Sequence, residues 1–446
     1  MNDAQSHPAR DRILADYAQV APLLPGARTP WVIRTRGMAL DQFAQAGFPS
    51  TRDEEWKYTS VAAIEKRSFT AMRKRADYRG FETEIATHLF ADLASHRLVF
   101  VDGCHAPALS TVGRLPFGVT VGTLGDALER TPEALEPYLT QARHQTIFGS
   151  LNTAFVSDGA YVHLERGAAL EEPIHVLFVA TTPNAAIHPR NLIVAQAGAQ
   201  VTVIEHYVGR DGAEYFTNAV TQIFTANGAT VEHCKLQQEA PQGFHIGAIH
   251  ATQSRDSRFV SHSMAFGAAL ARNDITTTFD AVGCTTALNG LYLVGGRQHV
   301  DHHTRIDHCQ PNGTSREYYR GVLDGRSRGV FNGKVIVHPG AQHTDAQQLN
   351  HNLLLSEGSE IDTKPQLEIY ADDVKCTHGA TIGQLDDAQI FYLRSRGVEE
   401  ATARALLTYA FAQDVIDRIP VAPVRARLAQ LLLSRLPQGH RIRELA

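Results

Sequence analysis

The chain has 446 residues, of which 43% are hydrophobic and 20% are charged, and its formal net charge is −5. This length suggests two or three domains and a sizeable core, and the near balance of charge gives no bulk attraction to nucleic acid or anionic lipid. The five cysteines are scattered and form no C-x-x-C pair, which excludes a disulfide framework, a zinc ribbon and a thioredoxin-like site. The sequence shows neither a signal peptide nor an apolar run of about 18 residues, so we expect a cytoplasmic protein with no membrane span.

Residues 1–95 have a polar, mostly helical pattern, and we predict an N-terminal helical region there. A short helical run at 39–46 ends at Gly47. Ser50 or Thr51 can cap a further short helix, because acidic residues follow in its first turn.

The first clear strand pattern lies at residues 97–101. A helical insertion is predicted near 123–157, with breaks at Pro132 and Pro137 because proline interrupts a helix interior.

From about residue 160 the sequence pattern changes to short β-rich runs separated by Gly-Ala or Asn-Gly turns. Gly167, Gly198 and Gly228 each begin a Gly-Ala pair followed by a strand, at spacings of 31 and 30 residues. A nearly fixed spacing is typical of a repeat architecture in which stacked coils share one core. We therefore predict that residues 96–386 form a β-solenoid, and a sandwich or barrel is the alternative.

Residues 387–446 return to a helical pattern and are predicted to form a C-terminal helical domain. A helix over 387–396 stops at Gly397, a typical C-terminal cap, and a longer helix begins near Glu399. Four apolar residues of this second helix fall at i+4 steps and form one stripe, which we expect to cover the open end of the solenoid; they are Ala403, Leu407, Phe411 and Val415.

Two apparent catalytic motifs are better explained as ordinary backbone. Residues 325–329 match G-x-S-x-G, but a β-like run follows where a nucleophile elbow needs a helix. Residues 329–335 resemble a phosphate loop, yet only three residues separate the glycines and Val335 has no hydroxyl for Mg²⁺. We expect no nucleotide to bind this chain through a standard loop.

Eight of the 22 histidines lie between residues 299 and 378. If residues 299–307 form a strand, imidazole and carboxylate groups alternate on one side of it, and such a face can ligate a divalent metal. Arg305 lies among them and disfavours a cation. Polar ladders that hydrogen-bond between coils are therefore the preferred interpretation.

Cys376 and His378 are two residues apart, so in a strand they project to the same face. A thiolate and an imidazole can hold iron, whereas a buried cysteine beside a satisfied histidine is the plainer interpretation. Two ligands are too few for a stable cluster, so any site here needs ligands from another chain.

The chain resembles the SufB/SufD family of the Suf iron–sulfur cluster assembly machinery. The resemblance rests on six segments, and the first of them favours the SufD branch: residues 52–59, 331–334, 347–356, 365–369, 372–383 and 391–397. It implies a right-handed parallel β-helix flanked by helical regions, and a scaffold subunit that is not itself an enzyme.

The same resemblance implies partners and site residues. The β-helix would pair with SufB, and the C-terminal helices would dock the ATPase SufC, which hydrolyses ATP in place of this chain. A transient iron–sulfur cluster would form at the SufB interface, with His378 as a metal ligand shared with that chain and Cys376 as the second ligand candidate. The ATPase-docking candidates are Phe391, Tyr392, Arg394 and Arg396.

Several alternatives stay open at this point. A SufB-like subunit would carry persulfide on a cysteine, with Cys234 and Cys284 as the candidates. A β-solenoid enzyme acting on carbohydrate would need an exposed cluster of charged residues along one groove. The resemblance leaves open the cluster type, the source of iron, the binding of a flavin, and a homodimer in the absence of SufB.

Overall fold

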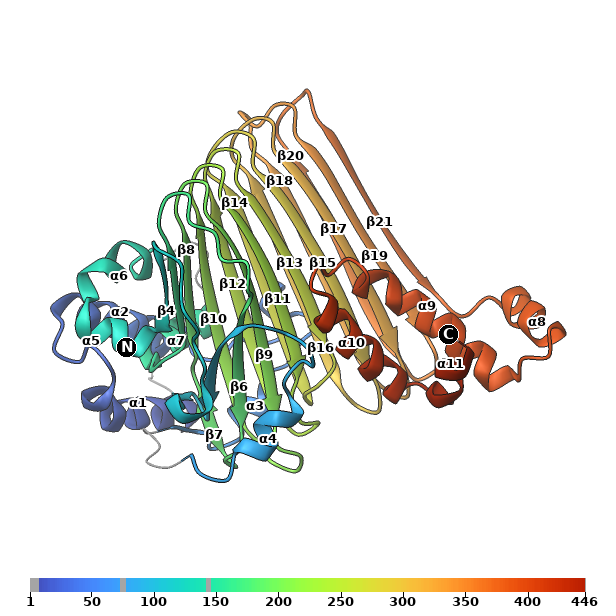
Figure 1. Cartoon of the computed structure of the whole chain (residues 1–446), viewed down its shortest axis with the longest axis horizontal. Coiled ribbons are helices and arrows are strands. Elements are labelled where there is room, and N and C mark those ends of the chain that lie inside the picture. The colour runs from blue at the N-terminus through green and yellow to red at the C-terminus, as the bar shows by residue number, and fades with distance from the viewer. Residues whose placement is uncertain (1–7, 73–77, 142–145, 446) are drawn as a thin grey trace.

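The computed structural model describes residues 8–72, 78–141 and 146–445, and its centre is a β-helix made of two parallel sheets (Figure 1). The chain alternates between the sheets, so each strand pairs with strands about one coil away on either side. This confirms the predicted solenoid and excludes the sandwich and the barrel.

The first sheet runs from an antiparallel N-terminal pair to its last strand in the order β4 (Val119–Thr123), β5 (Ala160–Leu164), β8 (Arg190–Ala195), β10 (Phe216–Thr225), β12 (Phe244–Gln253), β14 (Leu270–Phe279), β16 (His299–His308), β18 (Arg328–Val337) and β20 (Glu360–Ile369). Two short strands attach beside it, β1 (Thr70–Ala71) and β7 (Ala185–Ile187).

The second sheet runs in parallel order β3 (Cys104–His105), β2 (His96–Val101), β6 (Ile174–Ala180), β9 (Gln200–Gly209), β11 (Thr230–Gln238), β13 (Arg258–Ala265), β15 (Thr285–Val294), β17 (Thr314–Leu323), β19 (Asp345–Leu354) and β21 (Lys375–Gly383), with only β3 antiparallel to its neighbour. The strand expected at 97–101 is β2.

The repeated glycines form the same turn in successive coils. Gly167, Gly198 and Gly228 have φ of +72°, +73° and +68°, which side chains disfavour. The amide of Gly198 donates to the carbonyl of Asn227, one coil further on, at 2.9 Å. The core lies between the two sheets, where in-register side chains such as Val201, Val231 and Phe259 stack as apolar ladders.

The N-terminal region consists of helices, most of which pack on the first sheet, whereas the last of them packs on the second sheet against Val99 and Leu177. They are α1 (Pro8–Val20), η1 (Ala21–Leu23), α2 (Pro30–Ala46), η2 (Glu54–Trp56), α3 (Ala62–Glu65) and α4 (Glu82–Thr87). The helix end predicted at Gly47 is confirmed, since this residue has φ +68°. The cap predicted at Ser50 or Thr51 is wrong, because Asp53 accepts the Ser50 amide in a turn and only the 3-10 segment η2 follows.

The predicted helical insertion contains α5 (Leu124–Arg130), α6 (Pro132–Leu139) and α7 (Ile147–Phe155), while η3 (Pro107–Leu109) precedes it. Pro132 opens α6 as expected for proline at a first helical position. The break predicted at Pro137 is wrong, because α6 is only eight residues long and tolerates the loss of one amide donor in its last turn. Residues 142–145 of the predicted insertion lie outside the described residues.

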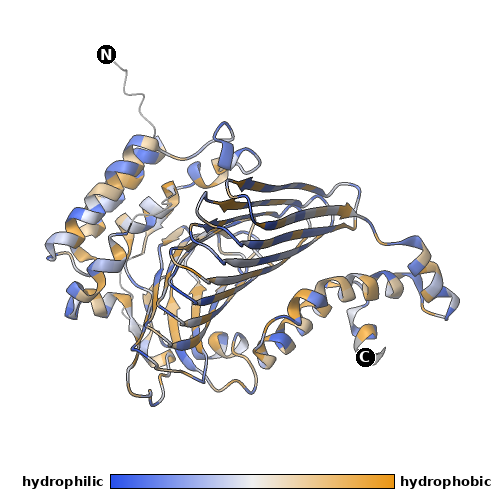
Figure 2. Ribbon diagram, turned by 90° about the horizontal axis from the view of Figure 1, so that it is seen from above, coloured by the Kyte–Doolittle hydropathy of each residue, from blue (hydrophilic) through white to orange (hydrophobic). Residues whose placement is uncertain are grey.

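The C-terminal region consists of α8 (Asp387–Ser395), α9 (Glu400–Ile416), α10 (Ala422–Arg435) and α11 (Gly439–Leu445). It lies on the opposite side of the β-helix from α1 and α2 (Figure 2), whereas Arg427 of α10 donates to the carbonyl of Thr87 at the end of α4. The expectation that the α9 stripe covers the open end of the solenoid is wrong. Phe411 and Val415 of the stripe instead pack on the outer face of the second sheet, because Leu236 and Leu291 give that face an apolar surface.

Candidate functional site

The last coil of the β-helix is uncovered. Along the described strands, β20 pairs only with β18 and β21 only with β19, so each sheet ends with one unpaired edge. Large apolar side chains are exposed at this end, namely Ile369 (41%), Tyr370 (61%) and Ile382 (52%). An exposed strand edge with apolar side chains is a template for pairing with another chain.

Cys376 and His378 both lie on β21, in this last coil. Their register partners on β19 are Ala346 and Gln348, which are buried between the sheets, so both residues occupy inward-facing positions. This confirms the prediction that they share a face. Cys376 packs against the end of the core, whereas His378 stays exposed because no further coil covers it.

The two side chains differ in their readiness to bind a metal. Burial raises the pKa of Cys376, the amide of Ala346 opposes this shift, and the charge of Asp345 adds to it. Cys376 is therefore a neutral thiol near pH 7, and the thiolate is the form that binds metal. Imidazole needs no such ionisation, so His378 is the better ligand candidate of the pair.

No group of three or more His, Cys, Asp or Glu side chains within the described ranges is arranged to hold a metal ion. An iron–sulfur cluster ordinarily takes four protein ligands. The open end thus offers two ligand candidates at a surface suited to a second chain, and a complete site would need that chain.

The histidine-rich strand β16 forms the polar ladder that the sequence favoured over a metal site. Asp301 accepts a hydrogen bond from Arg272 Nη1 of the neighbouring coil at 3.0 Å and from Thr59 Oγ1 at 2.5 Å. His303 Nε2 lies 3.0 Å from Asp301 Oδ1, and its Nδ1 lies 3.4 Å from Glu55 Oε2. The imidazoles and carboxylates of this face therefore bind protein groups, including the N-terminal segment.

The discarded catalytic motifs have simple structures. Ser327 is buried in the turn between β17 and β18, where its hydroxyl donates to the carbonyl of Val294. The run that resembled a phosphate loop is strand β18 itself. Neither motif has the strand-to-helix geometry that a nucleophile elbow or a phosphate loop requires.

The two cysteines that would carry persulfide in a SufB-like subunit are buried. Cys234 is 2% exposed beneath the C-terminal helices, and Cys284 is fully buried in the core. Burial raises the pKa of both thiols, so neither is a nucleophilic thiolate at neutral pH. This arrangement weighs against the SufB-like alternative.

Helix α8 carries the candidate ATPase-docking residues. It packs on α9 and projects from the body of the molecule (Figure 1). Phe391 and Tyr392 are 73% and 58% exposed, and the guanidinium of Arg396 lies 5.3 Å from the Tyr392 ring centre. Arg394 is paired with Glu400 at 3.1 Å. The helix therefore presents an apolar surface flanked by cations.

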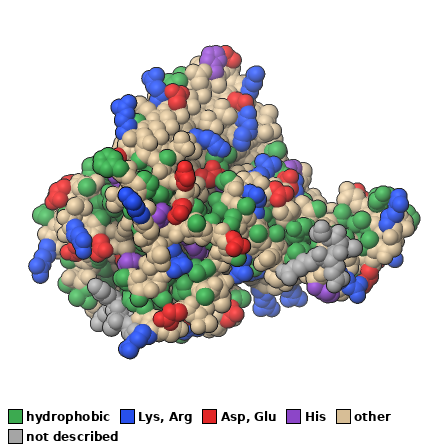
Figure 3. Space-filling view, in the orientation of Figure 1, with side chains coloured by type: hydrophobic (Ala, Val, Ile, Leu, Met, Phe, Trp, Pro, Cys, Tyr) green, Lys and Arg blue, Asp and Glu red, His purple; other side chains and the backbone are tan. Residues whose placement is uncertain are grey.

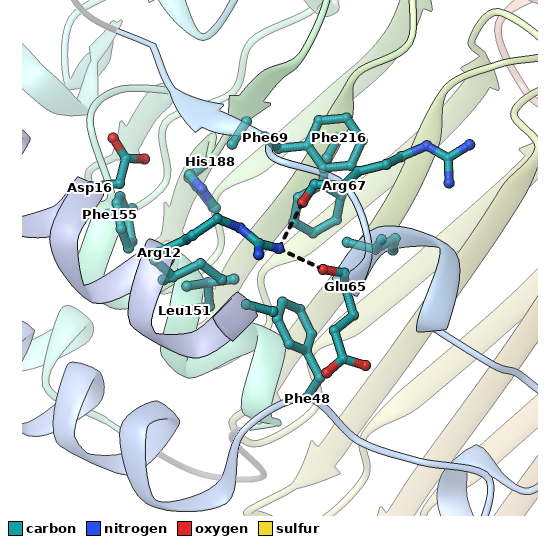
Figure 4. A pocket seen from close by; sticks show the side chains of 14 residues that line it. Arg12, Asp16, Phe48, Glu65, Arg67, Phe69, Leu151, Phe155, His188 and Phe216 are labelled. Atoms are coloured by element: carbon teal, nitrogen blue, oxygen red, sulfur yellow. Dashed lines mark hydrogen bonds between the residues drawn. The ribbon is translucent and has the colours of Figure 1, made fainter. Parts of the chain in front are cut away.

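A small crevice lies between α1 and the edge of the first sheet (Figure 4). Its volume is about 30 Å³, and aromatic side chains including Phe48, Phe155 and Phe216 line it. Arg12 Nη2 closes one side by donating to the carbonyl of Glu65 at 2.9 Å. The crevice lies where the N-terminal helices contact the β-helix, and it has room for little more than a water molecule.

The face shown in Figure 3 mixes charges of both signs and shows no large area of one charge. Among the described residues no helix is both long and apolar enough to cross a membrane.

The exposed apolar residues of the last coil were missed by sequence reasoning. The signal that could have revealed them is Ile382, an apolar residue within a strand that has no later repeat to cover it.

These features define a class: a two-sheet β-helix that ends in an open coil with an exposed histidine and carries a projecting helix. The SUF system FeS cluster assembly SufBD core domain matches residues 178–411, and the SufBD protein N-terminal region matches residues 9–176. The chain belongs to the SufBD family.

Proteins of this family from other organisms are similar in sequence to most of the chain. An iron–sulfur cluster assembly SufBD family protein of Synechocystis is 35% identical, with 93% of each chain covered. The iron–sulfur cluster assembly protein SufD of Escherichia coli is 32% identical, with 90% of this chain and 92% of that protein covered. The chloroplastic protein ABCI7 of Arabidopsis thaliana is 26% identical, with 88% and 83% covered.

Proposed function

We propose that the chain is a SufD-like, non-catalytic scaffold subunit of iron–sulfur cluster assembly, acting in the cytoplasm. The observation that carries this proposal is the open last coil, where His378 lies on the inward face beside exposed apolar residues. The similarity to SufD over most of the chain supports the same assignment.

The partner proposed for the open end is the related β-helix of SufB. Edge strands β20 and β21 offer about ten residues each for pairing with another strand, and Ile369 and Ile382 would supply apolar contact. The same surface would pair with a second copy of this chain when SufB is absent.

Iron and sulfide would be cargo at this interface. His378 would supply one ligand, Cys376 a second after it loses its proton, and SufB the rest. A site divided between two chains suits a scaffold, because moving the chains apart removes half of the ligands and releases the cluster.

The partner proposed for α8 is the ATPase SufC. Phe391 and Tyr392 offer an apolar anchor, Arg396 adds positive charge at its edge, and Arg394 borders it as an ion pair with Glu400. ATP would bind and be hydrolysed on SufC alone. Because only a few residues separate β21 from α8, a movement of SufC would act on the coil that carries His378.

The test is anaerobic co-purification of this chain with SufB and SufC, followed by iron and sulfide analysis. We expect His378→Ala to leave the assembly intact and to lower bound iron at least tenfold. The matched control is Thr377→Ala, on the same strand but facing outward. An unchanged iron content in His378→Ala would contradict the ligand assignment, and the absence of any assembly would contradict the scaffold role.

A further inference from the structure

Three amide side chains of β19 point into the β-helix, and two of them have their hydrogen bonds satisfied. Asn350 Oδ1 accepts from Asn352 Nδ2 at 2.6 Å and from Thr363 Oγ1 at 2.9 Å. Asn350 Nδ2 donates to the hydroxyl of Tyr292 at 3.1 Å. This tight network accounts for the asparagines of the Q-Q-L-N-H-N run.

The third amide, Gln348, is different. Its Nε2 donates to Glu317 Oε2 at 2.6 Å, but its Oε1 is buried and has no hydrogen-bond partner among the described residues. A buried amide oxygen without a donor is destabilising and uncommon in native proteins. The side chain is fully buried, so bulk water does not satisfy it.

The orientation of the Gln348 amide is fixed from two sides. Glu317 accepts the Nε2 hydrogen, which commits the NH₂ end of the amide to the preceding coil. Gly333 on the facing sheet leaves the space that Nε2 fills, since a Cβ at that position would overlap it. The glycine of the F-N-G-K segment therefore has a role here, as a space for this amide.

His378 occupies the position next to Gln348. The two residues are register partners on adjacent strands, and such strands lie about 4.8 Å apart. Both positions face inward, and the exposed imidazole has room to change rotamer. A rotamer that turns the ring inward would therefore bring a ring N–H of His378 toward the unpartnered oxygen.

We propose that Gln348 is a positioning residue for His378: Gln348 Oε1 accepts the N–H of one ring nitrogen and so directs the lone pair of the other toward iron. The proposal rests on the proposed function, in which His378 is an iron ligand. Imidazole ligands commonly donate their second N–H to an acceptor that fixes the tautomer and the ring orientation. Loss of such an acceptor typically weakens metal affinity by about 10–100-fold.

The experiment measures Fe(II) affinity by anaerobic equilibrium dialysis on the chain co-purified with SufB and SufC. Gln348→Met keeps the length of the side chain but removes the acceptor, and we expect iron affinity to fall by about 10–100-fold. Gln348→Glu keeps an oxygen acceptor, and we expect it to remain within about threefold of wild type. Burial raises the pKa of Glu317 to about 7, so a proton shared with Glu317 makes the glutamate variant tolerable.

The order of the two variants in iron affinity separates a positioning role of Gln348 from a packing role. If the side chain served only for packing, the methionine variant would keep its affinity and the glutamate variant would lose it. Gln347→Met is the matched control, since this neighbour is exposed on the outer face. If Gln348→Met does not fold, Gln348→Leu replaces it as the variant without an acceptor: an affinity at least tenfold below that of Gln348→Glu supports the proposal, and equal affinity overturns it.

His378→Ala separates this inference from the proposed function. If His378→Ala keeps the iron, the ligand assignment itself fails. If His378→Ala loses the iron but Gln348→Met keeps it, only the role of Gln348 is overturned.

Discussion

Arg272 of strand β14 stacks on Trp56 of the N-terminal segment, with its guanidinium carbon 3.8 Å from the ring centre. The same guanidinium donates to the carbonyl of Glu55 at 2.6 Å and to Asp301 at 3.0 Å. One buried cation thus joins the N-terminal segment to two coils of the β-helix.

Trp56→Ala should lower the free energy of unfolding by about 3–5 kcal/mol, since it removes a buried aromatic ring and uncovers Arg272. Urea denaturation followed by circular dichroism measures the change. Lys57→Ala, at an exposed neighbour, should stay within about 0.5 kcal/mol of wild type. Equal effects of the two changes would show that the stacking contributes nothing.

The His303 contacts should make stability depend on pH. Burial alone lowers the pKa of His303, but the charge of Asp301 and the hydrogen bonds to Asp301 and Glu55 outweigh burial and Arg272, and raise it to about 9. A pKa above the unfolded value of about 6.5 stabilises the fold below pH 6.5, and this stabilisation disappears as pH rises through 9.

We therefore expect the stability difference between wild type and His303→Gln to shrink by roughly 2–3 kcal/mol between pH 6.5 and 9.5. Denaturation curves at several pH values measure it. His440→Gln, at an exposed position of α11, is the control and should show no such trend. A pH-independent difference would contradict the charge assignment of His303.

Ile382→Glu should weaken pairing with SufB at least tenfold, because a carboxylate would be buried against the partner's strands without a counter-charge. The fold should persist, since Ile382 is 52% exposed. Analytical ultracentrifugation measures the association. Ile33→Glu matches this change at 53% exposure on α2, away from the open end, and should pair normally. Equal binding by both variants would place the interface elsewhere.

The double change Phe391→Ala and Tyr392→Ala should reduce binding of SufC more than tenfold while leaving SufB binding intact, since exposed aromatic side chains often dominate an interface. Co-purification with each partner separately measures the two interactions. Phe117→Ala removes an aromatic side chain that is 97% exposed in the turn before β4, and this variant should bind both partners. Loss of both partners in the double variant would mean that α8 supports the whole C-terminal region instead.

The solenoid could be predicted because each of its coils needs a turn residue of the same backbone conformation at the same position. Gly167, Gly198 and Gly228 each allow a positive φ that other residues resist, so the repeat is visible in the sequence. Strand alternation likewise placed Cys376 and His378 on one face, although only the register with β19 shows that this face is the inward one.

The packing of the C-terminal helices could not be predicted from their own pattern. The stripe containing Ala403 and Val415 shows that one side of α9 is buried but not what buries it. The missing information lay in the second sheet, where Leu236 and Leu291 give the outer face an apolar surface. The contacts of Gln348 could not be predicted either, because they join residues of three strands, β17, β18 and β19, and depend on the space left by Gly333.

The two kinds of contact in this molecule differ in when they can form during synthesis. Each coil pairs with one that lies about 30 residues away, so loop closure costs every coil a similar and modest entropy, and the β-helix can grow as the chain emerges. The ion pair between Glu54 and Lys364 spans 310 residues and cannot form until β20 has been made. The N-terminal segment therefore makes this contact late, after β20, the last strand of the first sheet, has formed.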